Sequence, residues 1–117
     1  MDTSLGEQLA ALVLKEIQNA YLKEEIVITN DCVDDMLREG LFEADVEKVI
    51  MGATSIEKAM PATSSKASSL KNTHYVIYGE STKCLNTYCK LCSNYHPVTG
   101  EFLVWRLTSF CIDKSKG

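Results

Sequence analysis

The last third of the chain decides the fold, because residues 101–111 read Glu-Phe-Leu-Val-Trp-Arg-Leu-Thr-Ser-Phe-Cys. Alternate side chains of an extended chain face opposite sides, and this stretch is rich in aromatic and branched residues, so we expect a strand. Two stretches before it, about 74–79 and 85–93, have the same character. Because glycine or proline separates the three stretches, they predict an antiparallel meander.

Upstream, the apolar residues recur at helical spacing. Ser4 and Glu7 match a capping box, and the pattern predicts a helix from about residue 4 to residue 23. The stripe could serve the core or a dimer contact, and we expect it to serve the core. It consists of Leu5, Leu9, Leu12, Val13, Ile17, Ala20 and Tyr21.

Two shorter helices follow. Asn30 or Asp31 can cap a second helix that ends at Gly40, and a third covers about 43–51. We expect the second helix to turn four apolar side chains inward, namely Cys32, Val33, Met36 and Leu37. The acidic side chains of both helices are expected mainly on a solvated face, and they are Asp31, Asp34, Asp35, Glu39, Glu43, Asp45 and Glu47.

These elements predict a single α+β domain over residues 1–117. We expect two or three N-terminal helices packed on one face of a mainly antiparallel sheet of three to five strands, including a strand near 55–60. Residues 1–25 form the first helix in this interpretation. Residues 26–117 form the core, with a flexible loop near 61–73, where serine, threonine and alanine predominate.

Charge is divided unevenly along the chain. Residues 1–52 contain twelve acidic and four basic residues, whereas residues 53–117 contain four acidic and eight basic ones. The basic half favours contact with RNA, although two oppositely charged faces could equally help the halves associate. No apolar run of about eighteen residues and no basic leader precede the first helix, so we expect neither a membrane span nor a signal peptide, and a cytoplasmic location.

The five cysteines are an odd number, and without a signal peptide they indicate reduced thiols. Four potential zinc ligands, Cys84, Cys89, Cys92 and His96, fall close together. The segment around residues 89 and 92 reads as strand, where these two positions face opposite sides. We therefore expect no metal and no cofactor, and a small zinc-binding protein remains an alternative.

The order of elements and three short motifs resemble the MqsR branch of the RelE-like bacterial toxins. Those proteins have Lys-Ser-Met, Tyr-x-Lys and Ser-Phe-Lys segments in this order. The chain has Lys58-Ala59-Met60, Tyr88-Cys89-Lys90 and Ser109-Phe110-Cys111, within a resemblance that covers roughly residues 26–111. The resemblance implies a RelE-like fold, endoribonuclease activity and an antitoxin-like protein partner. Cys111 stands where the family has its last lysine.

A second resemblance is to small uncharacterised bacterial domains encoded beside YgiT-type zinc-finger proteins. Their pattern opens with Ile-Thr-x-His-Ala-x-x-Arg-Met-x-x-Arg-Gly-Ile and continues with Asp-Val-Glu. The chain keeps the framework as Ile28-Thr29, Met36, Gly40-Leu41 and Asp45-Val46-Glu47. At the histidine and the two arginine positions it has Asp31, Asp35 and Glu39 instead.

Metal-free cleavage of RNA needs a group that removes the 2′-hydroxyl proton, positive charge on the phosphorane and a proton donor for the 5′-oxygen. Lys58, Lys90 and Arg106 can supply the charge. Tyr88 or His74 can exchange the proton. Tyrosine ionises near pH 10, so a base role for Tyr88 would need neighbouring cations that lower its pKa.

Two functions therefore follow from the sequence. The first is an MqsR/RelE-like endoribonuclease that acts through Lys58, Tyr88, Lys90, Arg106 and His74 without a metal. The second is a non-catalytic protein-interaction module on the same fold, with acidic helices that contact a partner.

Overall fold

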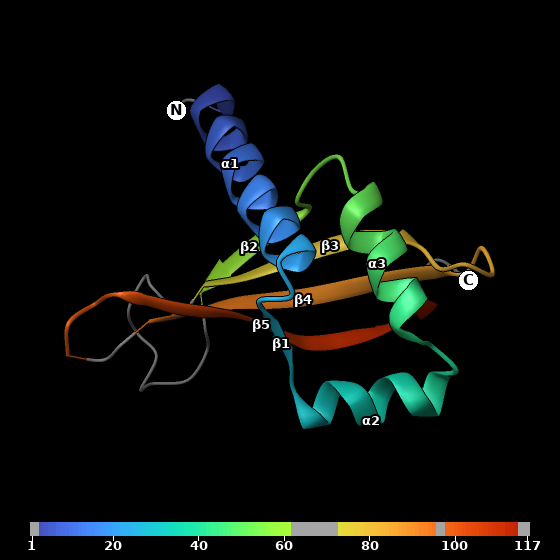
Figure 1. Cartoon of the computed structure of the whole chain (residues 1–117). Coiled ribbons are helices and arrows are strands. Elements are labelled where there is room, and N and C mark those ends of the chain that lie inside the picture. Colours follow the sequence, from blue (N-terminus) through green and yellow to red (C-terminus); the bar gives the residue numbers. More distant parts are fainter. Residues whose placement is uncertain (1–2, 62–72, 96–97, 115–117) are drawn as a thin grey trace.

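The computed structural model describes residues 3–61, 73–95 and 98–114, with helices first and strands after them (Figure 1). The α+β class is confirmed, and the strand predicted near 55–60 corresponds to a strand at Lys58–Pro61. The elements are α1 (Thr3–Leu22), β1 (Ile26–Ile28), α2 (Asn30–Glu39), α3 (Glu43–Gly52), β2 (Lys58–Pro61), β3 (Thr73–Glu80), β4 (Asn86–Tyr95) and β5 (Phe102–Ile112).

The strands form one five-stranded sheet in the order β1-β5-β4-β3-β2. β2, β3, β4 and β5 pair in antiparallel fashion, which confirms the predicted meander. β1 lies parallel to β5 at the other edge, with Ile26 opposite Trp105. Both edge strands are short, which limits the open hydrogen-bonding edge that the sheet presents.

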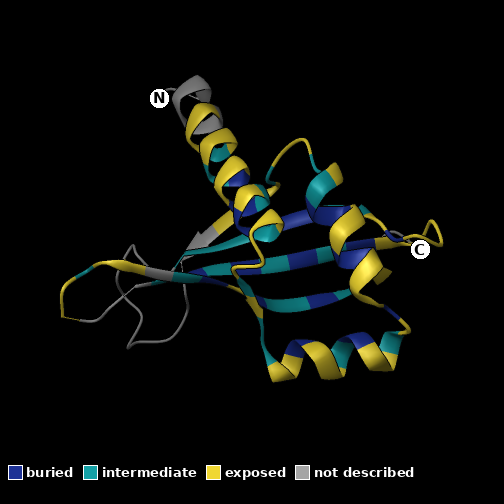
Figure 2. Cartoon of the chain, in the orientation of Figure 1, coloured by how far each residue is buried: buried dark blue, intermediate teal, exposed yellow. Residues whose placement is uncertain are grey.

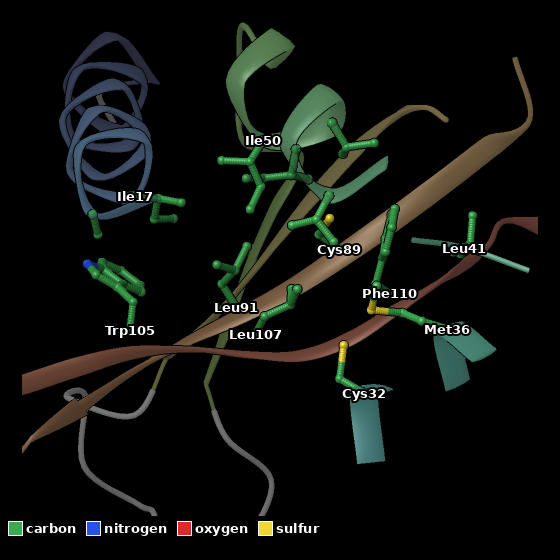
Figure 3. Close-up of a cluster of buried hydrophobic side chains, with 14 of the residues drawn as sticks. Ile17, Cys32, Met36, Leu41, Ile50, Cys89, Leu91, Trp105, Leu107 and Phe110 are labelled. Carbon is green, nitrogen blue, oxygen red and sulfur yellow. The ribbon is translucent and has the colours of Figure 1, made fainter. Parts of the chain in front are cut away.

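α1 and α3 cover one face of the sheet, and α2 lies beside β5 (Figure 1). The buried positions of the strands and helices face one another between these layers (Figure 2). Figure 3 shows the resulting core, in which Ile17 of α1 and Ile50 of α3 lie above Leu91, Leu107 and Phe110 of the sheet, all fully buried. Trp105 and Phe110 are also core residues.

Only part of the predicted α1 stripe is buried. Ile17 and Ala20 of the stripe are buried, whereas Leu9 and Leu12 are 56% and 59% exposed, and Leu14, which the stripe did not include, is also buried. The reason is the position of the helix, because its C-terminal half lies over the sheet and its N-terminal half extends past it (Figure 1). The prediction that the whole stripe serves the core is therefore wrong for these two leucines.

The N-cap residue of α2 lies one position before the two predicted candidates, Asn30 and Asp31. The Thr29 hydroxyl, rather than Asn30 or Asp31, accepts a hydrogen bond from the Cys32 N–H at 3.2 Å. Gly40 ends the helix with φ of 73°, a left-handed conformation that favours glycine. The inward stripe is narrower than predicted: Cys32 and Met36 are buried, whereas Val33 and Leu37 are exposed, since α2 meets the sheet at its edge rather than on its face.

Asp45 of α3 is buried, which corrects its prediction as part of a solvated acidic face. Its carboxylate accepts hydrogen bonds from the N–H of Phe42 at 2.8 Å and from the N–H and hydroxyl of Thr82 at 2.8 and 2.7 Å. Burial raises the pKa of this carboxyl group, but the hydrogen bonds from Thr82 and Phe42 outweigh it and leave the pKa below its ordinary value. Asp45 thus caps α3 and ties it to the β3–β4 turn.

A bulge interrupts the strict alternation predicted for β5. The register with β4 shifts between Lys90, which lies opposite Ser109, and Leu91, which lies opposite Leu107. The extra residue, Thr108, donates its hydroxyl to the Lys90 carbonyl at 3.1 Å. Consequently Leu107 and Phe110, three residues apart, both face the core.

Among the residues that the structure describes, no helix combines the length and the apolar character that crossing a bilayer requires.

Candidate functional site

The candidate site residues lie on the face of the sheet opposite α1 and α3, which we call the open face. In β4, Cys89 and Leu91 point toward the helices and are buried. Tyr88 and Lys90, which alternate with Cys89 and Leu91 along the strand, therefore point to the open face, where both are half-buried. The cross-strand register extends this face over the other strands.

One row across the open face contains two lysines. Lys58 of β2 lies opposite Val76 of β3, Val76 lies opposite Lys90 of β4, and Lys90 lies opposite Ser109 of β5. Adjacent strands are about 4.8 Å apart, so the Cα atoms of Lys58 and Lys90 are roughly 10 Å apart. Flexible lysine side chains at this spacing can reach one phosphodiester segment.

The neighbouring row contains the histidine and the arginine. His74 of β3 lies opposite Cys92 of β4, which lies opposite Arg106 of β5. Burial, and then the positive charge of Lys90, lower the pKa of His74. Burial raises the pKa of the Cys92 thiol, and Arg106 offsets part of that effect. His74 is therefore a neutral imidazole near pH 7, next to cations.

Tyr88 lies in a third row, on the other side of Lys90. It is opposite Tyr78 on β3, with ring centroids 6.4 Å apart, and opposite Cys111 on β5. Burial raises the pKa of Tyr88, and Cys111 and Asp35 raise it further. This direction is opposite to what a base role requires, so Tyr88 keeps its proton and can act only as a donor.

Asp35 and Glu39, two of the acidic replacements, surround this third row. The Cys111 thiol lies 3.9 Å from a carboxylate oxygen of Asp35. Glu39 accepts a hydrogen bond from the Ile112 N–H at 2.8 Å and forms an ion pair with Lys114 at 3.3 Å. Glu39 therefore supplies a hydrogen-bond acceptor to the edge of β5 at a position that β1 does not reach.

The pairing of Glu39 with Ile112 joins residues 73 positions apart. No local pattern in the sequence signals such a contact, and this explains why Asp35 and Glu39 read only as solvated acids. Asp31, the third replacement, is exposed.

The cysteines do not form the predicted alternative zinc cluster within the described residues. Cys89 is fully buried in the core, Cys92 lies on the open face, and Cys84 is exposed in the β3–β4 turn. His96 lies outside the described residues. Among the residues that are described, no group of three or more histidine, cysteine, aspartate or glutamate side chains is arranged to hold a metal ion.

The open face thus brings Lys58, Lys90, Arg106 and His74 into two adjacent rows and sets Tyr88 one row away, beside acidic groups. Basic side chains in rows on the surface of a sheet suit an extended anionic polymer. Neither family models, nor curated proteins, nor solved structures give a match to this chain.

Proposed function

We propose that the chain is an MqsR/RelE-like RNA endonuclease domain that holds the RNA backbone on its open face. The observation that carries this proposal is the placement of Lys58, Lys90 and Arg106 in adjacent rows on the face of the sheet opposite α1 and α3, with the neutral His74 beside Lys90. The row spacing allows all three cations to contact neighbouring phosphates of one strand.

The chemistry follows from the order of the rows. A phosphate above Lys90 has His74 on one side and Tyr88 on the other. The neutral His74 imidazole accepts the 2′-hydroxyl proton, and the 2′-oxygen attacks the phosphorus. The lysines and Arg106 stabilise the phosphorane charge. The bond to the 5′-oxygen breaks as Tyr88 donates its proton, which leaves a 2′,3′-cyclic phosphate and a 5′-hydroxyl.

A second candidate function is a non-catalytic module that binds RNA or protein through the same fold. The acidic surroundings of Tyr88 favour it. Asp35 lies beside Cys111 where the resembling toxins have a lysine, so the third row lacks the cation that would steady a phosphate near Tyr88. The third row is thus the part of the open face that favours binding without cleavage.

One experiment separates the two functions. The purified chain is mixed with a short fluorescein-labelled single-stranded RNA, binding is measured by anisotropy over a salt series, and products are resolved on a gel. We expect Lys90→Ala to weaken binding and to reduce the salt slope by about 1, as for one lost phosphate contact. Lys83→Ala, an exposed turn lysine, is the matched control and should leave both values unchanged.

His74→Asn then tests catalysis. We expect it to retain RNA binding and to lose roughly 100-fold or more of the cleavage rate, the usual contribution of a general base. Binding without cleavage by the wild-type chain would refute the endonuclease and support the non-catalytic module. Absence of both binding and cleavage would refute RNA as the ligand of the open face.

A further inference from the structure

A groove runs along the edge strand β1, and we call it the β1 groove. It consists of two cavities that share Glu24 and Ile26. The first, of about 540 Å³, lies between the end of α1, β1 and the start of α3. The second, of about 680 Å³, lies between α1, β1 and the start of β5. Both volumes are in the range of sites that accept a side chain or a small ligand.

The first cavity has both apolar and acidic lining residues. Ile26 and Ile28 are among the apolar ones, and Glu24, Glu43 and Glu47 are the acidic ones. None of these three carboxylates forms an ion pair with any part of the chain that is described. Glu43 and Glu47 are four residues apart on α3, where two like charges destabilise a helix.

The negative charge of these glutamates also affects Tyr21. Its hydroxyl lies 3.5 Å from a carboxylate oxygen of Glu43. Burial raises its pKa, and the charges of Glu43 and Glu47 raise it further. A positive ligand group in the cavity would offset the negative charge of these carboxylates.

The second cavity offers exposed apolar groups beside the edge of the sheet. Val27 and Phe102 are 48% and 47% exposed, and the Phe102 ring lies 5.8 Å from that of Trp105. The Thr29 N–H bonds to the Leu107 carbonyl of β5, so by alternation the main-chain groups of Ile28 point to the free edge of β1.

We propose that the β1 groove docks a basic, extended segment of a partner protein. An arginine or lysine of that segment enters the acidic cavity, where its methylene stem lies on Ile26 and Ile28 and its charged head meets the glutamates. A neighbouring apolar side chain packs against Phe102 and Val27. Charge complementarity favours a basic occupant, because the described lining of the two cavities contains one lysine, Lys23, and five glutamates, which are Glu16, Glu24, Glu25, Glu43 and Glu47.

The proposal does not depend on RNA binding, since its ligand has the opposite charge. The test uses a fluorescein-labelled peptide of alternating arginine and valine with blocked ends, and anisotropy with the full chain. Peptides of alternating arginine and serine, and of alternating glutamate and valine, are run in parallel. We expect the arginine–valine peptide to bind, and both others to bind roughly tenfold or more weakly.

The matched variants carry the same change in net charge. The triple variant Glu24→Gln, Glu43→Gln and Glu47→Gln should lose roughly tenfold or more in affinity. A control triple variant, Glu57→Gln, Glu80→Gln and Glu101→Gln, changes exposed glutamates elsewhere and should bind as the wild type does. Circular dichroism confirms that each variant is folded.

Three outcomes would overturn the proposal. Equal losses of peptide affinity in the two triple variants would show that binding depends only on the net charge of the chain. Equal binding of the arginine–serine peptide would remove the apolar anchor. Dimerisation of the wild-type chain in sedimentation, abolished by the first triple variant, would make a second copy the occupant.

Discussion

Strand β4 carries two sets of side chains that share a backbone but differ in their surroundings. Cys89 and Leu91 face the helices and are fully buried, whereas Tyr88 and Lys90 face the open side and are half-buried among polar groups. Because side chains alternate along a strand, the same strand supplies residues to the core and to the candidate site. A shift of register by one residue would exchange the two sets, so the core holds the site in place.

The strongest test of this comparison uses adjacent residues of β5. Phe110 is fully buried in the core, and Ser109 lies on the open face opposite Lys90. We expect Phe110→Ala to lower the free energy of unfolding by about 3–5 kcal/mol, because it leaves a cavity. Ser109→Ala should change it by less than about 0.5 kcal/mol. Urea denaturation measures both, and similar losses would contradict the assignment of the two faces.

Asp45 shows whether the covered side depends on more than apolar packing. Asp45→Ala leaves the N–H groups of Phe42 and Thr82 without their acceptor, so we expect a loss of about 2–3 kcal/mol in unfolding free energy. Asp34→Ala, at an exposed acid of α2, is the control and should cost less than about 0.5 kcal/mol.

The pH dependence of the free energy of unfolding gives a second test of the stabilisation by Asp45. Its pKa is lowered in the folded state, so its stabilisation is present above the unfolded value of about 3.9 and disappears as the pH falls through the lower folded value. We expect the unfolding free energy of Asp45→Asn to vary less below about pH 4 than that of the wild type. Parallel curves for the two proteins would exclude this role.

The same substitution, cysteine to serine, at Cys89 and at Cys92 compares the two faces of the sheet. Cys89→Ser places a hydroxyl in the core, where Cys89 is fully buried, and should cost about 1–3 kcal/mol. Cys92→Ser should cost less than about 0.5 kcal/mol, because a serine can keep the hydrogen bond to the Ser93 carbonyl.

The same two cysteines test the zinc alternative. Since they face opposite sides of the sheet, we expect a chelator to leave the melting temperature of the wild-type chain unchanged. A fall on chelation, with one zinc per chain by elemental analysis, would mean that the thiols bind metal.

The smallest expected effect lies on the open face. The pKa of His74 is lowered by burial and by Lys90, so protonation of His74 weakens the fold as the pH falls below about 6.5 and through the folded value. Lys90→Met should raise the pKa of His74 toward its ordinary value, as measured by NMR titration, whereas Lys83→Met should not. An unchanged pKa of His74 in Lys90→Met would show that the charge of Lys90 does not act on His74.

Much of the fold could be predicted because its elements carry strong local signals. The boundaries of α2 and α3, the three long strands and the core positions of Trp105 and Phe110 agree with the pattern of the sequence. The bulge at Thr108 could not be predicted, because it depends on the pairing of two strands and not on either strand alone.

The candidate site was accessible to sequence reasoning only in part. Residues 88 and 90 share a face in any strand, and this placed Tyr88 beside Lys90. That His74 lies next to Lys90, and that Asp35 and Cys111 raise the pKa of Tyr88, depends on which strands and helices are neighbours. Local spacing carries no information about such neighbours.

The sequence by itself determined the element types and, apart from β5 with its bulge, the side of the long strands that faces the core, because these follow from periods of 3.6 and 2 residues along one chain. The tertiary structure decided which surfaces meet: the burial of Asp45, the exposure of Leu9 and Leu12, and the closure of the β5 edge by Glu39. Each of these depends on contacts between residues far apart in the chain, whose energies appear only once the layers have packed.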